Sequence, residues 1–217
     1  MIKKKNFEVK DPMSALTHFI GFLAVIPCAV FLIRKALGEH SIFSLVGFII
    51  FSISLLLLYG ASTIYHTLKL SDAKTKILRR IDHMMIFVLI AGTYTPICLI
   101  ALEGAWRWGM LTLIWAIAIA GILMKAFWLT APRWLSTGIY ILMGWLAVIV
   151  FFPLGRATGM KGLLLLLSGG IAYTVGAVIY GTKKPNLTFK NFGFHEIFHV
   201  FVLIGSGIHI AFMFECL

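Results

Sequence analysis

Three histidines have the spacing to bind a metal ion. His195 and His199 are four residues apart in an apolar stretch, so on a helix their rings lie one turn apart on the same face. Such a pair can bind a single ion, and a histidine from another helix completes three protein ligands. His66, which ends a second apolar stretch, is the candidate. Three protein ligands with a water in the fourth position are typical of catalytic zinc.

Two further polar residues can act beside such an ion. Asp82 opens a third apolar stretch, and Ser62 lies one helical turn before His66 on the same face. A carboxylate near the ion can accept a proton from an activated water, or it can support a ligand imidazole. The segment from His195 to His199 also reads His-Glu-x-x-His, the zinc-protease pattern in which the glutamate, here Glu196, is the general base.

Each of these residues also has a structural interpretation. The imidazoles can hydrogen-bond between helices or to lipid head groups at a membrane surface. Asp82 can stabilise the start of a helix through the helix dipole, or it can pair with Arg79 or Arg80, which precede it. Glu196 is rotated by about 100° from His195 on a helix, away from an ion held between the two rings. The residue types alone therefore allow both a catalytic and a structural role.

The elements that carry these residues are too apolar for a water-soluble protein. Of the 217 residues, 60% are hydrophobic and 12% are charged, and the mean hydropathy is +0.98. Soluble domains contain about 25% charged residues. The composition therefore excludes a soluble enzyme, a DNA-binding module and a disordered chain. In a membrane protein the net charge of +11 indicates orientation and contact with anionic lipid head groups rather than nucleic acid.

Seven apolar runs are long enough to cross the hydrocarbon core as helices, which takes about 20 residues each. None alternates in the pattern of a transmembrane β-strand. The runs lie near 15–33, 43–66, 82–102, 109–128, 135–152, 162–180 and 195–214. We therefore predict an all-α integral membrane protein, in which a short basic segment, residues 1–14, precedes a seven-helix transmembrane domain, residues 15–214.

The basic residues predict how the bundle is oriented. With a cytoplasmic N-terminus, the inner segments hold 14 of the 19 Lys and Arg residues and the outer segments hold five. The positive-inside rule therefore predicts a cytoplasmic N-terminus and an external C-terminus in the plasma membrane. In this topology His66, Asp82 and His195 lie at the same depth, near the cytoplasmic face, although they are far apart in the sequence.

The seventh run carries a polar stripe of His195, His199, Ser206 and His209. At about 100° per residue these side chains share one narrow face, and a polar stripe on an apolar helix is expected to face the bundle interior. His209 lies ten residues beyond His199, or about 15 Å along the axis. It is therefore too far away to bind the same ion.

Short motifs connect the chain with a known family. They are Ser14–His18, Ser62–His66, Asp82–Phe87 followed by Ala91–Pro96, and His195–His199. Over essentially its whole length the chain resembles the bacterial hemolysin III proteins. These belong with the progestin and adipoQ receptors, which include the adiponectin receptors, and more distantly with the alkaline ceramidases.

The resemblance implies both a fold and a site. It implies seven helices with a cytoplasmic N-terminus, and zinc bound by His66, His195 and His199. It also implies that Asp82 faces the zinc-bound water, with Ser62 beside it. The glutamate of the seventh-run motif is not part of the family pattern, so the resemblance implies no general-base role for it.

These observations lead to one main functional hypothesis and three alternatives. The main hypothesis is a zinc-dependent hydrolase of an amide or ester bond in a membrane lipid, whose tails enter the bundle from the side. The first alternative is a membrane-homeostasis sensor or receptor in which zinc is structural. The second is a cytolytic protein, although the sequence has no amphipathic inserting segment and no continuous polar pore. The third is an intramembrane zinc protease that uses the His-Glu-x-x-His pattern.

Overall fold

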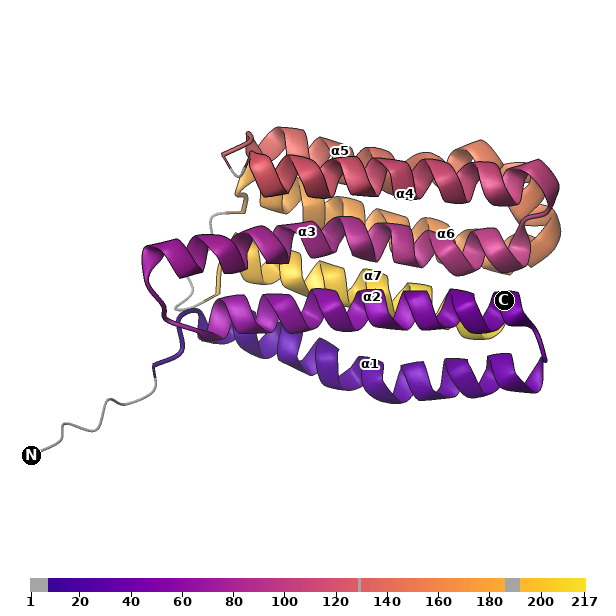
Figure 1. The fold of residues 1–217 in the computed structure, drawn as a ribbon, viewed down its shortest axis with the longest axis horizontal. Helices are drawn as coiled ribbons and strands as arrows, with labels where there is room; N and C mark the ends of the chain where they lie inside the picture. The colour runs from indigo at the N-terminus through magenta and orange to yellow at the C-terminus, as the bar shows by residue number, and fades with distance from the viewer. Residues whose placement is uncertain (1–7, 129, 186–191) are drawn as a thin grey trace, which may run out of the picture.

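The chain folds into an all-helical bundle. The computed structural model describes residues 8–128, 130–185 and 192–217, and its helices run roughly along the long axis of the molecule (Figure 1). They are α1 (Pro12–Gly38), α2 (Ile42–Thr67), α3 (Asp72–Pro96) with a π-helical extension (Ile97–Ala101), α4 (Gly104–Phe127), α5 (Arg133–Trp145), a 3₁₀ segment (Leu146–Val150), α6 (Phe151–Thr182) and α7 (Phe194–Cys216). Helices suit these apolar runs because in lipid a segment has to satisfy its own backbone hydrogen bonds.

Local signals fix where the first helices begin. Pro12 occupies the first turn of α1, where its missing N–H costs no helical hydrogen bond. At the start of α2 the Ser41 side chain accepts a hydrogen bond from the backbone N–H of Ser44 at 3.2 Å. Only a few residues separate α1 from α2 and α2 from α3, so consecutive helices run in opposite directions (Figure 1).

Six of the helices form a ring. α1 packs against α2 and α7, α2 packs against α3, α3 packs against α5, and α6 packs against α5 and α7. α4 packs mainly against α3 and stands outside this ring. All six ring helices, and not α4, contribute side chains to a central cavity. The ring is thus the framework that positions the candidate site.

The chain reverses direction within one long helical stretch, residues 133–182. Gly159 interrupts it with φ 66° and ψ −176°, a left-handed conformation that favours glycine. On either side the two arms face each other: Trp145 donates a hydrogen bond to the Thr174 hydroxyl at 3.0 Å, and Arg133 donates one to the Tyr180 carbonyl at 3.4 Å. α5 and α6 accordingly lie side by side (Figure 1). The predicted runs 135–152 and 162–180 fall on opposite sides of Gly159.

The surface of the bundle is suited to lipid. Within the described residues, six helical stretches are long and apolar enough to cross a membrane, with residues 133–182 counted as one. Large apolar side chains such as Phe31, Phe127 and Phe152 are exposed. The prediction of an all-α membrane bundle is confirmed, and the count of seven spans stays a prediction.

One sequence-based interpretation of Asp82 is wrong. α3 begins at Asp72 rather than near residue 82, so Asp82 lies ten residues, or about 15 Å, inside the helix. The first turns of α3 are too polar to belong to an apolar run, yet they continue the same helix. Asp82 therefore cannot stabilise the helix start through the dipole, which acts only within the first turn.

Candidate metal centre

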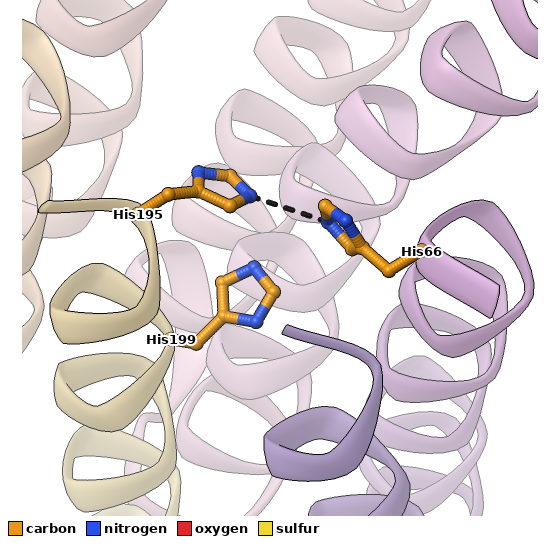
Figure 2. A group of neighbouring side chains, drawn as sticks. All are labelled: His66, His195 and His199. Atoms are coloured by element: carbon orange, nitrogen blue, oxygen red, sulfur yellow. Dashed lines mark hydrogen bonds between the residues drawn. The ribbon is translucent and has the colours of Figure 1, made fainter. Parts of the chain in front are cut away.

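Three imidazole rings meet at one end of the bundle. His66 lies in the last turn of α2, and His195 and His199 lie in the first two turns of α7. Each ring offers one nitrogen, and these three atoms all lie within 4.8 Å of one another. Figure 2 shows the rings facing one another, with the Nε2 atoms of His66 and His195 3.2 Å apart. The structure thus brings together the three predicted ligands.

Hydrogen bonds hold two of these rings from behind. Nδ1 of His66 lies 2.9 Å from the Asp11 carboxylate. Nδ1 of His199 lies 3.3 Å from the Ser14 carbonyl and 3.2 Å from the Thr17 hydroxyl. A ring that donates from Nδ1 keeps the lone pair of Nε2 free, which is the usual arrangement behind metal-binding histidines. Three such nitrogen donors fit a divalent transition metal such as zinc.

The contribution of Asp11 does not follow from the sequence pattern. Backbone N–H groups of Lys10 and Asp11 donate to the carbonyls of Thr67 and His66, at 3.3 and 2.9 Å. This short pairing lays the segment before α1 along the end of α2 and brings the Asp11 carboxylate to His66. The sequence alone indicates only that Asp11 precedes Pro12 at the start of a helix. Lys10 pairs with the same carboxylate at 3.3 Å.

Asp82 and Ser62 lie beside the histidines, on the wall of the central cavity. Both are buried, with 8% and 1% of their surface exposed, and both line the cavity together with His195 and His199. Within the described part of the chain the Ser62 hydroxyl has no hydrogen-bond partner. A carboxylate and a hydroxyl therefore share one cavity with two of the three histidines.

A fourth imidazole stands against this group. The ring of His18, in α1, stacks on that of His199 with the ring centroids 3.6 Å apart and the planes 11° from parallel. His18 is buried and lines the cavity, and neither of its nitrogens has a hydrogen-bond partner among the described residues. A parallel stack points its nitrogens alongside those of His199 rather than toward them.

The contacts of Glu196 differ from those of the general base that the zinc-protease pattern suggests. One of its carboxylate oxygens accepts a hydrogen bond from the Ser14 hydroxyl at 2.5 Å, and the other accepts one from the backbone N–H of Gly193 at 2.8 Å. The second bond caps the start of α7, and the first ties α7 to α1. This geometry favours a structural role for Glu196.

The other histidines lie apart from the three-histidine group. His209 is buried further along α7, where its ring packs on Gly169 at a distance that leaves no room for a Cβ. Nε2 of His83 lies 3.4 Å from the Tyr180 hydroxyl. The predicted polar stripe of α7 does face inward, since His199, Ser206 and His209 are buried. The Ser206 hydroxyl accepts a hydrogen bond from Tyr59 at 2.7 Å.

The central cavity that these residues share is mostly apolar. It measures about 120 Å³ and extends from the histidines to the seam between α5 and α6, where Trp145 and Thr174 are hydrogen-bonded to each other. Apart from the polar groups near the histidines, most of its wall consists of aliphatic and aromatic side chains. An apolar chamber with a few convergent polar groups is the usual form of a small-molecule site.

Known proteins resemble this chain along its whole length. A Hemolysin-3 homolog of Bacillus subtilis (strain 168) is 43% identical over 212 residues, which cover 97% of this chain and 94% of that protein. Hemolysin-3 of Bacillus cereus is 38% identical over 216 residues, with 100% and 94% covered. An adiponectin receptor protein of Drosophila melanogaster is 24% identical over 214 residues, covering 89% of this chain and 47% of the receptor.

The family described as Haemolysin-III related matches residues 8–210, which include every residue of the three-histidine group and of the central cavity. The motifs around His66, Asp82 and His195 predict this family, and the match confirms it. Together with the long apolar helices, it also confirms a multi-pass protein of the cell membrane. The chain therefore belongs to the haemolysin-III related family.

Proposed function

We propose that this protein is a zinc-dependent hydrolase that cleaves an amide or ester bond of a membrane lipid. In this proposal the chain crosses the membrane seven times with a cytoplasmic N-terminus, and the three-histidine group lies near the cytoplasmic face. The observation that carries the proposal is the position of the group: three histidine nitrogens lie within 4.8 Å of one another, and two of these histidines line an apolar cavity that also holds a buried carboxylate.

The residues would divide the reaction among them. His66, His195 and His199 would hold the ion, which would act as a Lewis acid and activate a water molecule. Asp82 would accept the proton that the water gives up as it attacks the carbonyl carbon of the lipid, and would deliver it to the amine or alcohol that leaves as the acyl bond breaks. The Ser62 hydroxyl, which has no partner among the described residues, would donate a hydrogen bond to the substrate. The apolar wall of the cavity accommodates the acyl chain and keeps bulk water away from it.

A structural role for the metal is the second candidate. The site joins α2 to α7 through its three histidines, and behind the rings lie Thr17 of α1 and Asp11, the residue before α1. An ion there would fasten three helices together, as a sensor or receptor requires if zinc only sets the helix arrangement. The relatives include a protein named as an adiponectin receptor, which is a further reason to test this function.

Lipid profiling of a deletion strain tests the hydrolase proposal. Complementation with the wild-type gene should lower one class of amide- or ester-linked lipid and raise its free fatty acid, and His66→Ala should fail to do so. A lipid profile that is identical with the wild type, with His66→Ala and with no gene would contradict the proposal. The His40→Ala variant, at an exposed histidine between α1 and α2, serves as a control for the loss of an imidazole that lines neither cavity.

A further inference from the structure

A second cavity lies at the same end of the bundle as the three-histidine group, and its wall is basic. It measures about 340 Å³. Arg79 of α3, Lys125 of α4 and Arg133 of α5 all line it, together with the polar residues Ser136 and Tyr65. No Asp or Glu is among the lining residues that the structure describes. We refer to it as the basic cavity.

The three cationic side chains have no acidic partner. In the described ranges 8–128, 130–185 and 192–217, the ion pairs of Lys and Arg are Lys10–Asp11, Lys35–Glu39, Lys69–Glu8 and Lys161–Glu215, and none involves the basic cavity. Residues 1–7, 129 and 186–191 contain no Asp or Glu in the sequence. No acid of this chain therefore forms an ion pair with Arg79, Lys125 or Arg133 in the described structure.

Two of the lining groups are buried and lack a partner or a counter-charge. Lys125 is only 4% exposed, and a buried ammonium without a counter-charge is costly. The Ser136 hydroxyl, in a residue 3% exposed, has no hydrogen-bond partner among the described residues. An anion in the cavity would compensate the ammonium and accept a hydrogen bond from the hydroxyl.

Contacts with aromatic rings and a backbone carbonyl fix the position of the Arg133 guanidinium. Its guanidinium carbon lies 4.8 Å from the ring centroid of Tyr180 and 5.9 Å from that of Phe194. One of its nitrogens donates to the Tyr180 carbonyl at 3.4 Å. Stacked, partly bonded arginines keep their remaining N–H groups in a fixed fork, which suits the oxygens of a phosphate group.

The basic cavity adjoins the central cavity, because the two share lining residues. His195, His83, Tyr140 and Tyr180 line both. His195 is a member of the three-histidine group, so one of the three histidines lies on the wall shared by the basic cavity and the central cavity. A ligand that occupies both chambers would be anionic at one end and apolar at the other, with its linking bonds at the histidines.

We propose that the basic cavity binds the phosphate group of an anionic membrane lipid, whose acyl chain passes the three-histidine group into the central cavity. This inference rests on the proposed function for the bond that is cleaved, and it names the substrate class as phosphate-bearing lipids. The shared chemistry is a phosphate group, which inorganic phosphate also offers. The basic residues here are more than markers of membrane orientation, since Lys125 is buried and faces the cavity.

Binding by the full-length protein in non-ionic detergent tests the inference. The probes are 1-oleoylglycerol 3-phosphate, 1-oleoylglycerol, which has the same tail without phosphate, and inorganic phosphate, and calorimetry measures their dissociation constants. The phosphorylated lipid should bind at least about tenfold more tightly than 1-oleoylglycerol, since hydrogen bonds between charged groups are the strong ones. Equal affinity for the two amphiphiles would overturn the inference.

Substitutions assign the preference to the basic cavity. Arg79→Gln, at an exposed side chain that leaves the packed core intact, and Lys125→Gln should each weaken binding of the phosphorylated lipid by about tenfold. Lys125→Arg should retain most of it. The matched control is Lys76→Gln, an exposed lysine one turn earlier on α3, which should change binding by less than about twofold. An equal loss of affinity in the control would mean that the overall charge at this end of the bundle attracts the lipid. It would refute binding of the phosphate group in the basic cavity.

Two further outcomes separate the possible explanations. Displacement of the phosphorylated lipid by inorganic phosphate at similar affinity would make the free anion the ligand and overturn the lipid assignment. The binding assay does not require turnover. A protein that prefers the phosphorylated lipid but cleaves no lipid would therefore retain this inference and refute the hydrolase. A protein that cleaves lipids but binds the phosphorylated and unphosphorylated lipids equally would support the hydrolase and refute this inference.

Discussion

At the scale of single residues, the site depends on which nitrogen each imidazole uses. His66 and His199 direct Nδ1 to hydrogen-bond acceptors and thereby leave Nε2 for an ion. The sequence predicts the three histidines because their spacing on one helix and their depth in the bundle are readable. It does not predict Asp11, since that contact depends on a backbone pairing between segments about 55 residues apart.

The first prediction concerns the ligands. Purified protein should carry about one zinc per chain, and His66→Ala should lose most of it, since two imidazoles bind an ion much more weakly than three. His66→Ala should also lower the unfolding temperature because binding of the ion contributes to folding stability. Elemental analysis measures the metal. His209→Ala, which removes a buried imidazole from the other part of α7, should keep its zinc, and equal loss in both variants would contradict the site.

A second prediction concerns the support behind the ligands. Asp11→Asn should weaken zinc affinity about 10- to 100-fold, because it removes the negative charge that orients His66 and raises its basicity. Competition with a chelator of known affinity gives the measurement. Glu8→Gln is the matched control, since Glu8 is exposed and pairs with Lys69 instead. Unchanged affinity in Asp11→Asn would show that the carboxylate does not support the site.

At the scale of elements, the helices continue beyond the apolar runs that predict them. Hydropathy identifies only the lipid-facing part of α3, so the charged turns from Asp72 to Ile81 are missed although they belong to the same helix. For the same reason, the sequence indicates only that Arg79 and Lys125 help to orient the chain in the membrane. In the structure both line the basic cavity. The reversal of the chain near Gly159 is easier to predict than the start of α3, because two apolar runs flank a short polar segment there.

The third prediction tests the close packing of α2 on α3. A Cβ added at Gly92 would overlap the Ser54 side chain of α2, so Gly92→Ala should destabilise the bundle by about 1–3 kcal/mol, the usual cost of overpacking. Thermal unfolding in detergent provides the measurement. Gly207→Ala, in α7, has nothing within 4 Å of the added carbon and should be close to neutral. Equal stability of both variants would contradict the packing of α2 on α3.

At the scale of the whole molecule, a ring of helices encloses a polar site within a lipid-facing surface. The apolar composition predicts a lipid-facing surface, and the length and spacing of the apolar runs predict the helices. The ring arrangement and the cavity depend on contacts between α1, α3, α5, α6 and α7 that no single segment specifies. The basic residues gather at the end that carries the three histidines, which is the end that the charge distribution predicts to be cytoplasmic.

The fourth prediction is therefore the orientation. A reporter fused after Leu217 should behave as external, and one inserted between α2 and α3, at residues 68–71, should behave as cytoplasmic. An alkaline phosphatase reporter, active outside, and a fluorescent-protein reporter, active inside, provide complementary readouts. A C-terminal fusion that behaves as cytoplasmic would refute the combination of seven spans with a cytoplasmic N-terminus, and an external fusion at residues 68–71 would refute the position of the site near the cytoplasmic face.

The most direct test of the hydrolase is Asp82→Asn, measured for zinc content and for release of fatty acid in the same preparation. Asparagine has nearly the shape of Asp82 and can still hydrogen-bond water, but it cannot accept a proton at neutral pH. Asp72→Asn, at the exposed start of the same helix, is the matched control. A catalytic site predicts that Asp82→Asn keeps its zinc and its fold while losing turnover by about 100-fold or more, with the control unaffected. Full turnover in Asp82→Asn would contradict the hydrolase and leave the zinc with a structural role.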